Sequence, residues 1–263
     1  LTGLSPEDDA RVPASMRVGV VRNPAEVRQA VRRIADAGAD VIKVIATGAV
    51  LTTGTLPGEV ELGPAELEAA VDEAAKHGLH VAAHAHGAEG IKIATRAGVR
   101  SIEHGSLMDD EAIALMAEHG TWLVADIYNG DYTDSVGTRE HWPAEILRKN
   151  RETTETQRVA FRKAVALGVN IAYGTDSGIY PHGLNALQLP YMVKYGMTPM
   201  QAVQSATINA ARLLRWENEI GSVAPGKYAD LIAVPLDALK DLSRFSTVAF
   251  VMKGGEVVKP LGR

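Results

Sequence analysis

Cysteine is absent from all 263 residues of the sequence. Disulfides and thiolate metal sites are therefore excluded, and any bound metal must be held by nitrogen and oxygen ligands. The net charge is −5 and no basic cluster occurs, so we expect no nucleic-acid partner. No apolar run approaches the ~18 residues that a membrane span needs, so we expect no membrane partner either. Without cysteines to indicate a redox environment, the compartment stays open between cytoplasmic and exported.

Two catalytic motifs are also missing. The sequence has no Gly-rich phosphate loop and no G-x-S-x-G elbow. Nucleotide chemistry and serine hydrolysis are therefore poorly supported. The chain also starts at Leu1 in a polar stretch, expected to be an irregular loop over residues 1–15, and we expect an upstream portion to be missing.

The composition suits a globular protein with a substantial core, because 46% of the residues are hydrophobic and 22% are charged. Five apolar runs of strand length alternate with helical segments: ADVIKVIATG, HVAAH, VRSIEH, TWLVAD and VNIAYGTD. Four of the linking helices end in a turn with glycine: Gly38, Gly78, Gly98 and Gly120. This alternation predicts βα units and a parallel sheet.

The remainder of the chain has a different character. A polar loop is expected after the fourth strand, followed by a helix of roughly Pro143 to Leu167. Two more helices are expected in HGLNALQLPYMVKYG and TPMQAVQSATINAARLL. The tail offers three short strands, YADLIAV, TVAFVMK and EVVK, with a turn at Gly254-Gly255. It predicts a small β unit beside the parallel sheet.

Two histidines mark the ends of neighbouring expected strands. His84 and His104 are 20 residues apart, about one strand–helix unit. Because successive parallel strands run in the same direction, both side chains should enter one site. The alternative is two satisfied polar residues at loop starts. His86 either shares the face of His84 on an extended chain or turns into the loop.

Lys43 and Asp176 end two further strands, and each has two interpretations. Lys43 lies in VIKVI, where it either reaches solvent or is a neutral amine that has captured carbon dioxide as a carbamate able to bridge two metals. Asp176 either caps the next helix or ligates a metal and accepts a proton from metal-bound water. Together with the two histidines, these groups suit zinc or a similar ion. An ion of this kind favours hydrolysis of an amide or ester.

Several runs resemble the amidohydrolase superfamily, in particular its imidazolonepropionase-like and Xaa-Pro dipeptidase-like branch. They are GADVIKVIATG, VAAHAHGAEGI, GVRSIEHGS, IAYGTDSG and MTPMQAVQSATINAARLL…GSVAPGKYADLIAV. The resemblance implies a (β/α)8 TIM-type barrel, of α/β class, beside a small β-sandwich built partly from the C-terminal tail. We assign residues 16–218 to the barrel portion and 219–263 to the sandwich.

The resemblance also implies residue roles. Lys43 matches a carboxylated lysine that bridges two metals, His84 and His104 match metal ligands, and Asp176 matches an aspartate that is both ligand and general base. The expected cofactors are Zn2+, binuclear in the complete enzyme, and carbon dioxide as the Lys43 carbamate. We further expect Tyr128, His86 and His182 to contact a small-molecule substrate, and the protein to be a homo-oligomer. The alternative for Tyr128 and His182 is a loop residue that fixes the rim of the site.

One departure from the family concerns its first strand, whose H-x-H pair is absent upstream of Lys43. We therefore expect this chain to supply strands four to eight, with the missing N-terminal segment as a possible partner. The leading functional hypothesis is metal-dependent hydrolysis of an amide bond to an amino acid, in a dipeptide or an N-acyl amino acid. The alternatives are hydrolysis of a cyclic amide, lactone or other ester at the same site, and an inactive fragment or pseudoenzyme.

Overall fold

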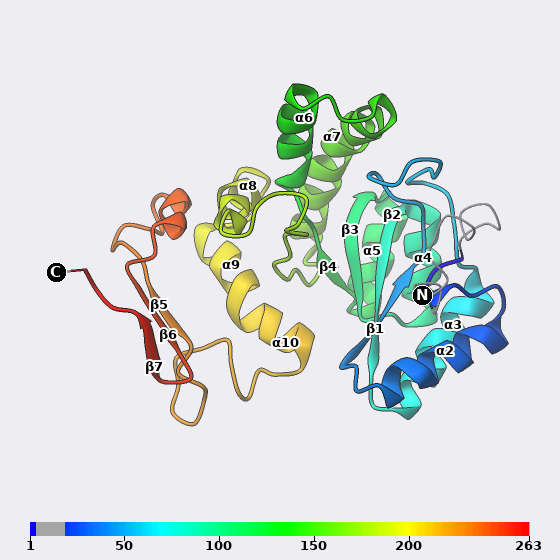
Figure 1. Cartoon of the computed structure of the whole chain (residues 1–263), viewed down its shortest axis with the longest axis horizontal. Helices are drawn as coiled ribbons and strands as arrows, with labels where there is room; N and C mark the ends of the chain where they lie inside the picture. Colours follow the sequence, from blue (N-terminus) through cyan, green and yellow to red (C-terminus); the bar gives the residue numbers. More distant parts are fainter. Residues whose placement is uncertain (4–18, 263) are drawn as a thin grey trace.

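The structure, a computed structural model, describes residues 1–3 and 19–262. The expected loop over residues 1–15 and the start of the barrel portion at residue 16 thus fall largely outside the described residues. Within them, four parallel strands form one sheet in the order β1-β2-β3-β4 (Figure 1). Their bounds are Val41–Ile45, His80–Gly87, Ser101–Leu107 and Trp122–Val124. The predicted parallel βα arrangement is confirmed for these strands.

Helix α2 precedes β1, helices α3, α4 and α5 connect successive strands, and the helices cover one face of the sheet (Figure 1). Their bounds are Pro24–Asp36 for α2, Pro64–Lys76 for α3, Ala88–Ala97 for α4 and Asp110–His119 for α5. The side chains of β1 alternate accordingly: Ile42 and Val44 are buried, whereas Val41 and Lys43 are exposed on the other face. The four glycines expected in the turns after these helices all have positive φ. They end the helices in a conformation that costs glycine least.

One α-helix of the described residues was not predicted. The expected polar loop contains α6, Asn129–Arg139, which lies beside the long helix α7, Ala144–Leu167. The segment is rich in residues with low helix propensity. Tertiary contacts hold it instead: Asn150 donates to the Gly130 carbonyl at 2.9 Å. A Cβ on Gly130 would stand 2.3 Å from Thr154 Oγ1, so only glycine permits this approach.

The fifth expected strand is also different. VNIAYGTD makes a single parallel bridge, between Ile171 and Leu123 of β4. The Leu123 amide donates to the Asn170 carbonyl at 2.8 Å, and the Ala172 amide donates to the Leu123 carbonyl at 3.1 Å. The next amide, that of Tyr173, donates to the Ser205 carbonyl instead. The chain therefore leaves the sheet after one bridge because the helical region that follows takes its hydrogen bonds.

The C-terminal third adds short helices and a second sheet. The helical elements are η2 Asn185–Leu187, α8 Gln188–Lys194, α9 Pro199–Gln204, the π-helix η3 Ser205–Asn209, α10 Ala210–Leu214 and the 3₁₀ helix η4 Leu242–Ser246. Strands β5 Leu231–Ala233, β6 Phe250–Lys253 and β7 Glu256–Lys259 form an antiparallel sheet, which confirms the predicted small β unit. Among the described residues, no helix has both the length and the apolar character that crossing a membrane requires.

Candidate active site

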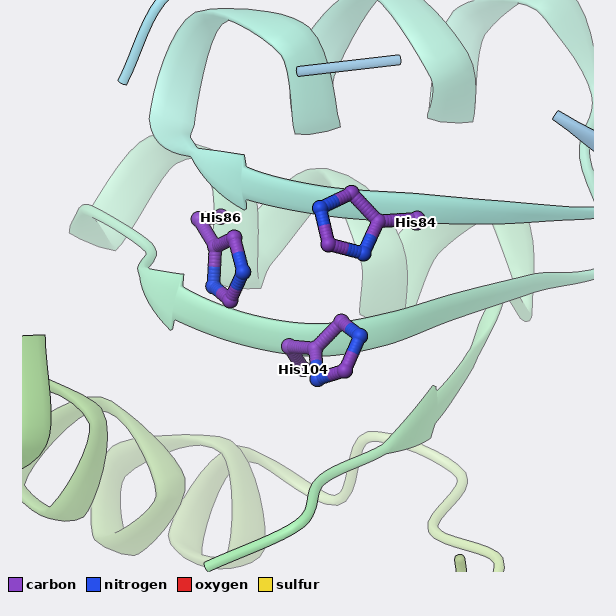
Figure 2. A group of neighbouring side chains, drawn as sticks. All are labelled: His84, His86 and His104. Carbon is purple, nitrogen blue, oxygen red and sulfur yellow. The ribbon is translucent and has the colours of Figure 1, made fainter. Parts of the chain in front are cut away.

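Three histidines from two adjacent strands meet at the carboxyl end of the sheet. His84 and His86 project from β2, and His104 projects from β3 (Figure 2). Their ring centroids are 4.7 Å apart for His84 and His86, 4.6 Å for His84 and His104, and 4.8 Å for His86 and His104. The predicted meeting of His84 with His104 is confirmed. Strand β2 runs on to Gly87, so His86 stays with them and does not turn away.

His84 is poised as a neutral nitrogen donor. Its residue is only 8% exposed, and the Gly48 backbone hydrogen-bonds its ring. The other nitrogen, Nε2, is buried and has no hydrogen-bond partner among the described residues. Burial, together with the nearby His104 and Lys43, lowers the pKa of His84 to about 3. An unprotonated, unpartnered nitrogen is what a metal ligand requires.

His86 is held from both sides. Its Nδ1 lies 2.8 Å from Ser106 Oγ, and its backbone amide donates to Thr47 Oγ1 at 2.9 Å. Burial lowers its pKa well below the ordinary value, and the neighbouring His104 and His84 act in the same direction. The ring is therefore fixed and neutral in the space between Ser106 and the other two histidines.

His104 belongs to a second cluster, with two carboxylates. Ligand atoms of His104, Asp126 and Asp176 lie within 4.8 Å of one another. His104 Nδ1 is 3.1 Å from Asp126 Oδ2. Asp126 accepts from Gln157 at 2.9 Å and from Asn129 at 2.7 Å, which fixes its carboxylate.

His104 and Asp126 each favour the charged form of the other. Burial opposes the charged form of His104, yet the Asp126 carboxylate outweighs it and raises the His104 pKa. Burial likewise opposes the charge on Asp126, and the contact with His104 outweighs it and lowers the Asp126 pKa. An anionic Asp126 is thus available to orient His104.

Backbone strain coincides with the same cluster. His104 has φ 72° and Asp176 has φ 47°, in the left-handed region that residues other than glycine rarely adopt. Each such conformation costs of order ~1 kcal/mol or more and persists only where the surroundings impose it. Strain of this kind is concentrated at functional sites, which supports a functional interpretation of both residues.

Lys43 lies at the same cavity as His84, His104 and Asp176. Its residue is exposed, which agrees with the interpretation of a side chain that reaches solvent, and the carbamate stays a prediction. The physical reason is the alternation along β1, which directs Lys43 to the face of the sheet opposite the buried Ile42 and Val44.

The structure places the two other expected substrate residues away from the histidines. Tyr128 lies in an aromatic cluster, with ring centroids 5.3 Å from Tyr180 and 5.2 Å from Tyr191, and it does not line the cavity. His182 is exposed and does not line it either. Their contacts with substrate stay predictions.

The cavity has a volume of about 220 Å³ and joins both clusters. Apolar residues line it from β1, from the loop that follows, and from the segment after Asp176: Ile45, Ala49, Val50, Leu51 and Ile179. Polar residues line it from α6 and α7: Thr133, Asn150, Thr153, Thr154 and Gln157. A pocket with apolar and polar walls and ionisable groups at its base has the features of a small-molecule site.

Asp126 is a site residue that the sequence interpretation missed. It ends the run TWLVAD, two positions before Tyr128, for which a substrate contact was predicted. The available signal was the carboxylate at the strand end itself, the position equivalent to that of His84 and His104. Gln157 was missed as well, because its helical position gives no sequence signal for its contact with Asp126.

The donor set fits a divalent metal. The buried, unpartnered Nε2 of His84 and the convergence of His104, Asp126 and Asp176 provide nitrogen and oxygen donors without cysteine. Zinc accepts this combination of donors. A carboxylate beside a ligating histidine, as Asp126 is beside His104, commonly orients the histidine ring.

Comparisons with known proteins agree with these features. The amidohydrolase family matches residues 8–258. The ochratoxinase of Aspergillus niger is 36% identical over 247 residues, covering 90% of this chain and 50% of that protein. The imidazolonepropionase of Brevibacillus brevis is 28% identical over 217 residues, covering 76% of this chain and 44% of that protein.

Solved structures are similar as well. The crystal structure of a Xaa-Pro dipeptidase with methionine bound in its active site has a TM-score of 0.89 and 40% identity to this chain. The match covers 98% of this chain and 63% of that one. The chain thus spans about half of the length of the curated relatives named above.

Proposed function

This chain belongs to the amidohydrolase family, and on that premise we propose that it hydrolyses an amide bond to an amino acid, in a dipeptide or an N-acyl amino acid. The predicted fold class is confirmed: an α/β fold of the TIM-barrel type, with parallel strands and a separate antiparallel sheet. The Xaa-Pro dipeptidase and the ochratoxinase among its relatives support an amide substrate.

The observation that carries the proposal is the convergence of the two clusters on one cavity. His84, His86 and His104 line it together, and His104 is shared with the carboxylates of Asp126 and Asp176. We propose His84, His104 and Asp176 as ligands of a divalent metal, with Lys43 as a further ligand when it carries a carbamate. A zinc ion held there would polarise a carbonyl and lower the pKa of a coordinated water.

The chain's own groups supply the rest. Asp176 is exposed toward the cavity and is proposed as the general base that accepts a proton from the attacking water. Asp126, fixed by Gln157 and Asn129, orients the ring of His104. The polar wall of α6 and α7 offers donors and acceptors for the carboxylate and amide of an amino-acid product.

A second candidate is hydrolysis of a cyclic amide at the same site. The observation that favours it is the similarity to an imidazolonepropionase. Both reactions would use the same protein groups, so only the substrate that the protein hydrolyses distinguishes the two candidates.

The test is a substrate panel on purified protein of known metal content. It contains dipeptides, N-acyl amino acids and cyclic amides. The proposal predicts turnover of dipeptides or N-acyl amino acids that rises with bound zinc. Zinc-loaded protein that hydrolyses only cyclic amides would establish the second candidate, and one that hydrolyses none of them would refute both.

A further inference from the structure

A fully buried lysine lies in α7, outside the clusters described above. The residue Lys149 has 0% exposure. A charged ammonium is very costly to bury unless it is paired and hydrogen-bonded. Lys149 does not line the cavity, so its charge is not presented to a substrate. Its partners therefore indicate what the residue does.

Three backbone carbonyls of one loop accept hydrogen bonds from Lys149. Its Nζ lies 3.3 Å from the carbonyl oxygen of Ala49, 2.6 Å from that of Thr52 and 3.0 Å from that of Thr55. These residues belong to the stretch 49–56 between β1 and α3, which we call the cavity loop. The bonds span about a hundred positions of sequence, so they join two remote parts of the chain.

An acid completes this attachment. Glu145, one turn before Lys149 in α7, lies 3.2 Å from Lys149 Nζ and accepts a hydrogen bond from the Gly54 amide at 3.0 Å. The Gly54 bond and then the Lys149 bond lower the pKa of the Glu145 carboxyl. The pair thus binds both the carbonyls and an amide of the cavity loop.

The base of the cavity loop is fixed separately. The Gly48 amide donates to the Glu59 carbonyl at 2.9 Å, and the Glu61 amide donates to the Ala46 carbonyl at 2.9 Å. The two ends of the loop are therefore paired with each other, through an antiparallel bridge between Thr47 and Val60. The tip of the loop is joined to α7 through Lys149 and Glu145.

The cavity loop contributes much of the apolar wall. Ala49, Val50 and Leu51 line the cavity together with Ile45 from the end of β1. The wall from α6 and α7 is polar. A substrate with an apolar side chain on one side of its amide and a charged or polar group on the other would match both walls.

We propose that Lys149 is a positioning residue that holds the cavity loop in place, and that the loop selects amide substrates carrying a large apolar side chain. This inference rests on the proposed function for its substrate but not for the attachment of the loop. Ala49 is both bonded to Lys149 and part of the wall, so the attachment fixes the wall directly.

The attachment is tested by hydrogen exchange in Lys149→Met, with Lys163→Met as the matched control. Lys163 lies in the same helix, but it is exposed and pairs with Asp110 on the surface. In Lys149→Met, amide exchange within residues 49–56 should accelerate about tenfold or more. The exchange rates of β2 and β3 and the amount of bound zinc should stay at wild-type levels. Lys149→Arg should restore part of the protection, and Lys163→Met should change nothing.

Unchanged exchange at residues 49–56 in a folded Lys149→Met protein would overturn the attachment. If that variant does not fold, Glu145→Ala provides the same measurement, because it removes the acceptor of the Gly54 amide at a partly exposed side chain. Faster exchange confined to the cavity loop supports the inference, and wild-type exchange refutes it.

Selectivity is tested with Leu51→Ala and with dipeptide pairs in which either residue is leucine or glycine. The ratio of kcat/KM for leucine over glycine should fall by about tenfold, within the range that loss of a few apolar carbons produces. Lys149→Met should lower the same ratio, whereas Lys163→Met should not. An unchanged ratio in Leu51→Ala overturns the selecting role. If the wild type hydrolyses no amide, the selecting role of the loop is refuted together with the proposed function. The exchange experiment still tests whether Lys149 holds the cavity loop.

Discussion

Asp176 and the histidines of the site have opposite surroundings. His84 and His86 are buried among apolar strands, which keeps both rings neutral. Asp176 is exposed and stands after the last bridge of the sheet with a strained backbone. An exposed carboxylate can reach the attacking water, and its replacement leaves no buried group without a partner.

Asp176→Asn should therefore abolish most turnover and leave the fold intact. Loss of a general base typically lowers kcat by about 10²–10⁴-fold. Steady-state kinetics and thermal unfolding measure the two effects, with Asp110→Asn, an exposed carboxylate of α5, as the control. A variant that keeps half of its activity would remove Asp176 from the mechanism.

Lys43 is chemically unusual among the cavity residues because it is the only one of them with a primary amine. We predict that it carries an extra carboxyl group when zinc is bound. Lys43→Ala should lose zinc and activity, with partial rescue by short carboxylic acids together with added zinc. Carbon-13 NMR with labelled bicarbonate should show a carbamate signal that Lys43→Ala lacks; zinc-loaded wild type without that signal contradicts the prediction.

Among the elements, α2 and α3 are joined through one acid. Glu73 of α3 is 3% exposed and lies 3.1 Å from Arg32 of α2 and 2.7 Å from Lys76. The hydrogen bond from Lys76 lowers the pKa of Glu73 below its ordinary value of 4.5, burial opposes this, and Arg32 adds to it. A carboxyl whose pKa is lower in the folded state stabilises the fold above its unfolded pKa. That contribution is lost as the pH falls through the folded pKa.

Glu73→Gln should accordingly lower the melting temperature by a few degrees at pH 7, and the difference from wild type should shrink below about pH 4.5. Thermal unfolding between pH 7 and pH 3 measures it. Glu68→Gln, an exposed acid on the same helix, is the control and should show little effect at any pH. A difference that stays constant over this range would show that the charge of Glu73 is not its cause.

How far the sequence could predict the elements depended on where their hydrogen bonds lie. The strands β1 to β4 and their helices followed from local patterns, apolar runs and glycine turns, which the structure confirms. Helix α6 did not, because Asn150 and the close approach at Gly130 hold a segment of low helix propensity. The prediction of a fifth strand was incomplete for a related reason. The Tyr173 amide donates to the Ser205 carbonyl in the remote helical region, and a strand pattern does not reveal this bond.

The site residues, like the elements, could be predicted where local patterns place them and not where remote contacts do. His84 and His104 could be predicted because equivalent strand ends of a parallel sheet lie side by side. Asp126 was missed although it ends a strand, and Gln157 reaches it from a helix 31 positions away. The exposure of Lys43 depended on which face of β1 the helices cover, and the run VIKVI, which is apolar on both sides of Lys43, does not specify that face.

In the whole molecule, the site is assembled from distant parts of the sequence. Its groups come from β1, β2, β3, the segment after β4 and the loop at Asp176, and they meet only when the sheet is formed. A metal held by these groups binds the folded state and not the unfolded chain, so it should also stabilise the fold. We propose that the histidine and carboxylate clusters form one divalent-metal site.

The most direct test is the amount of zinc bound per chain, measured by inductively coupled plasma mass spectrometry after dialysis against buffered zinc. We predict at least one ion per wild-type chain and a loss of most of it in the double variant His84→Ala, His104→Ala. His119→Ala, at a histidine in the last turn of α5, should keep the wild-type amount. A folded wild-type chain that binds no zinc, or a double variant that binds as much as the wild type, would contradict the account.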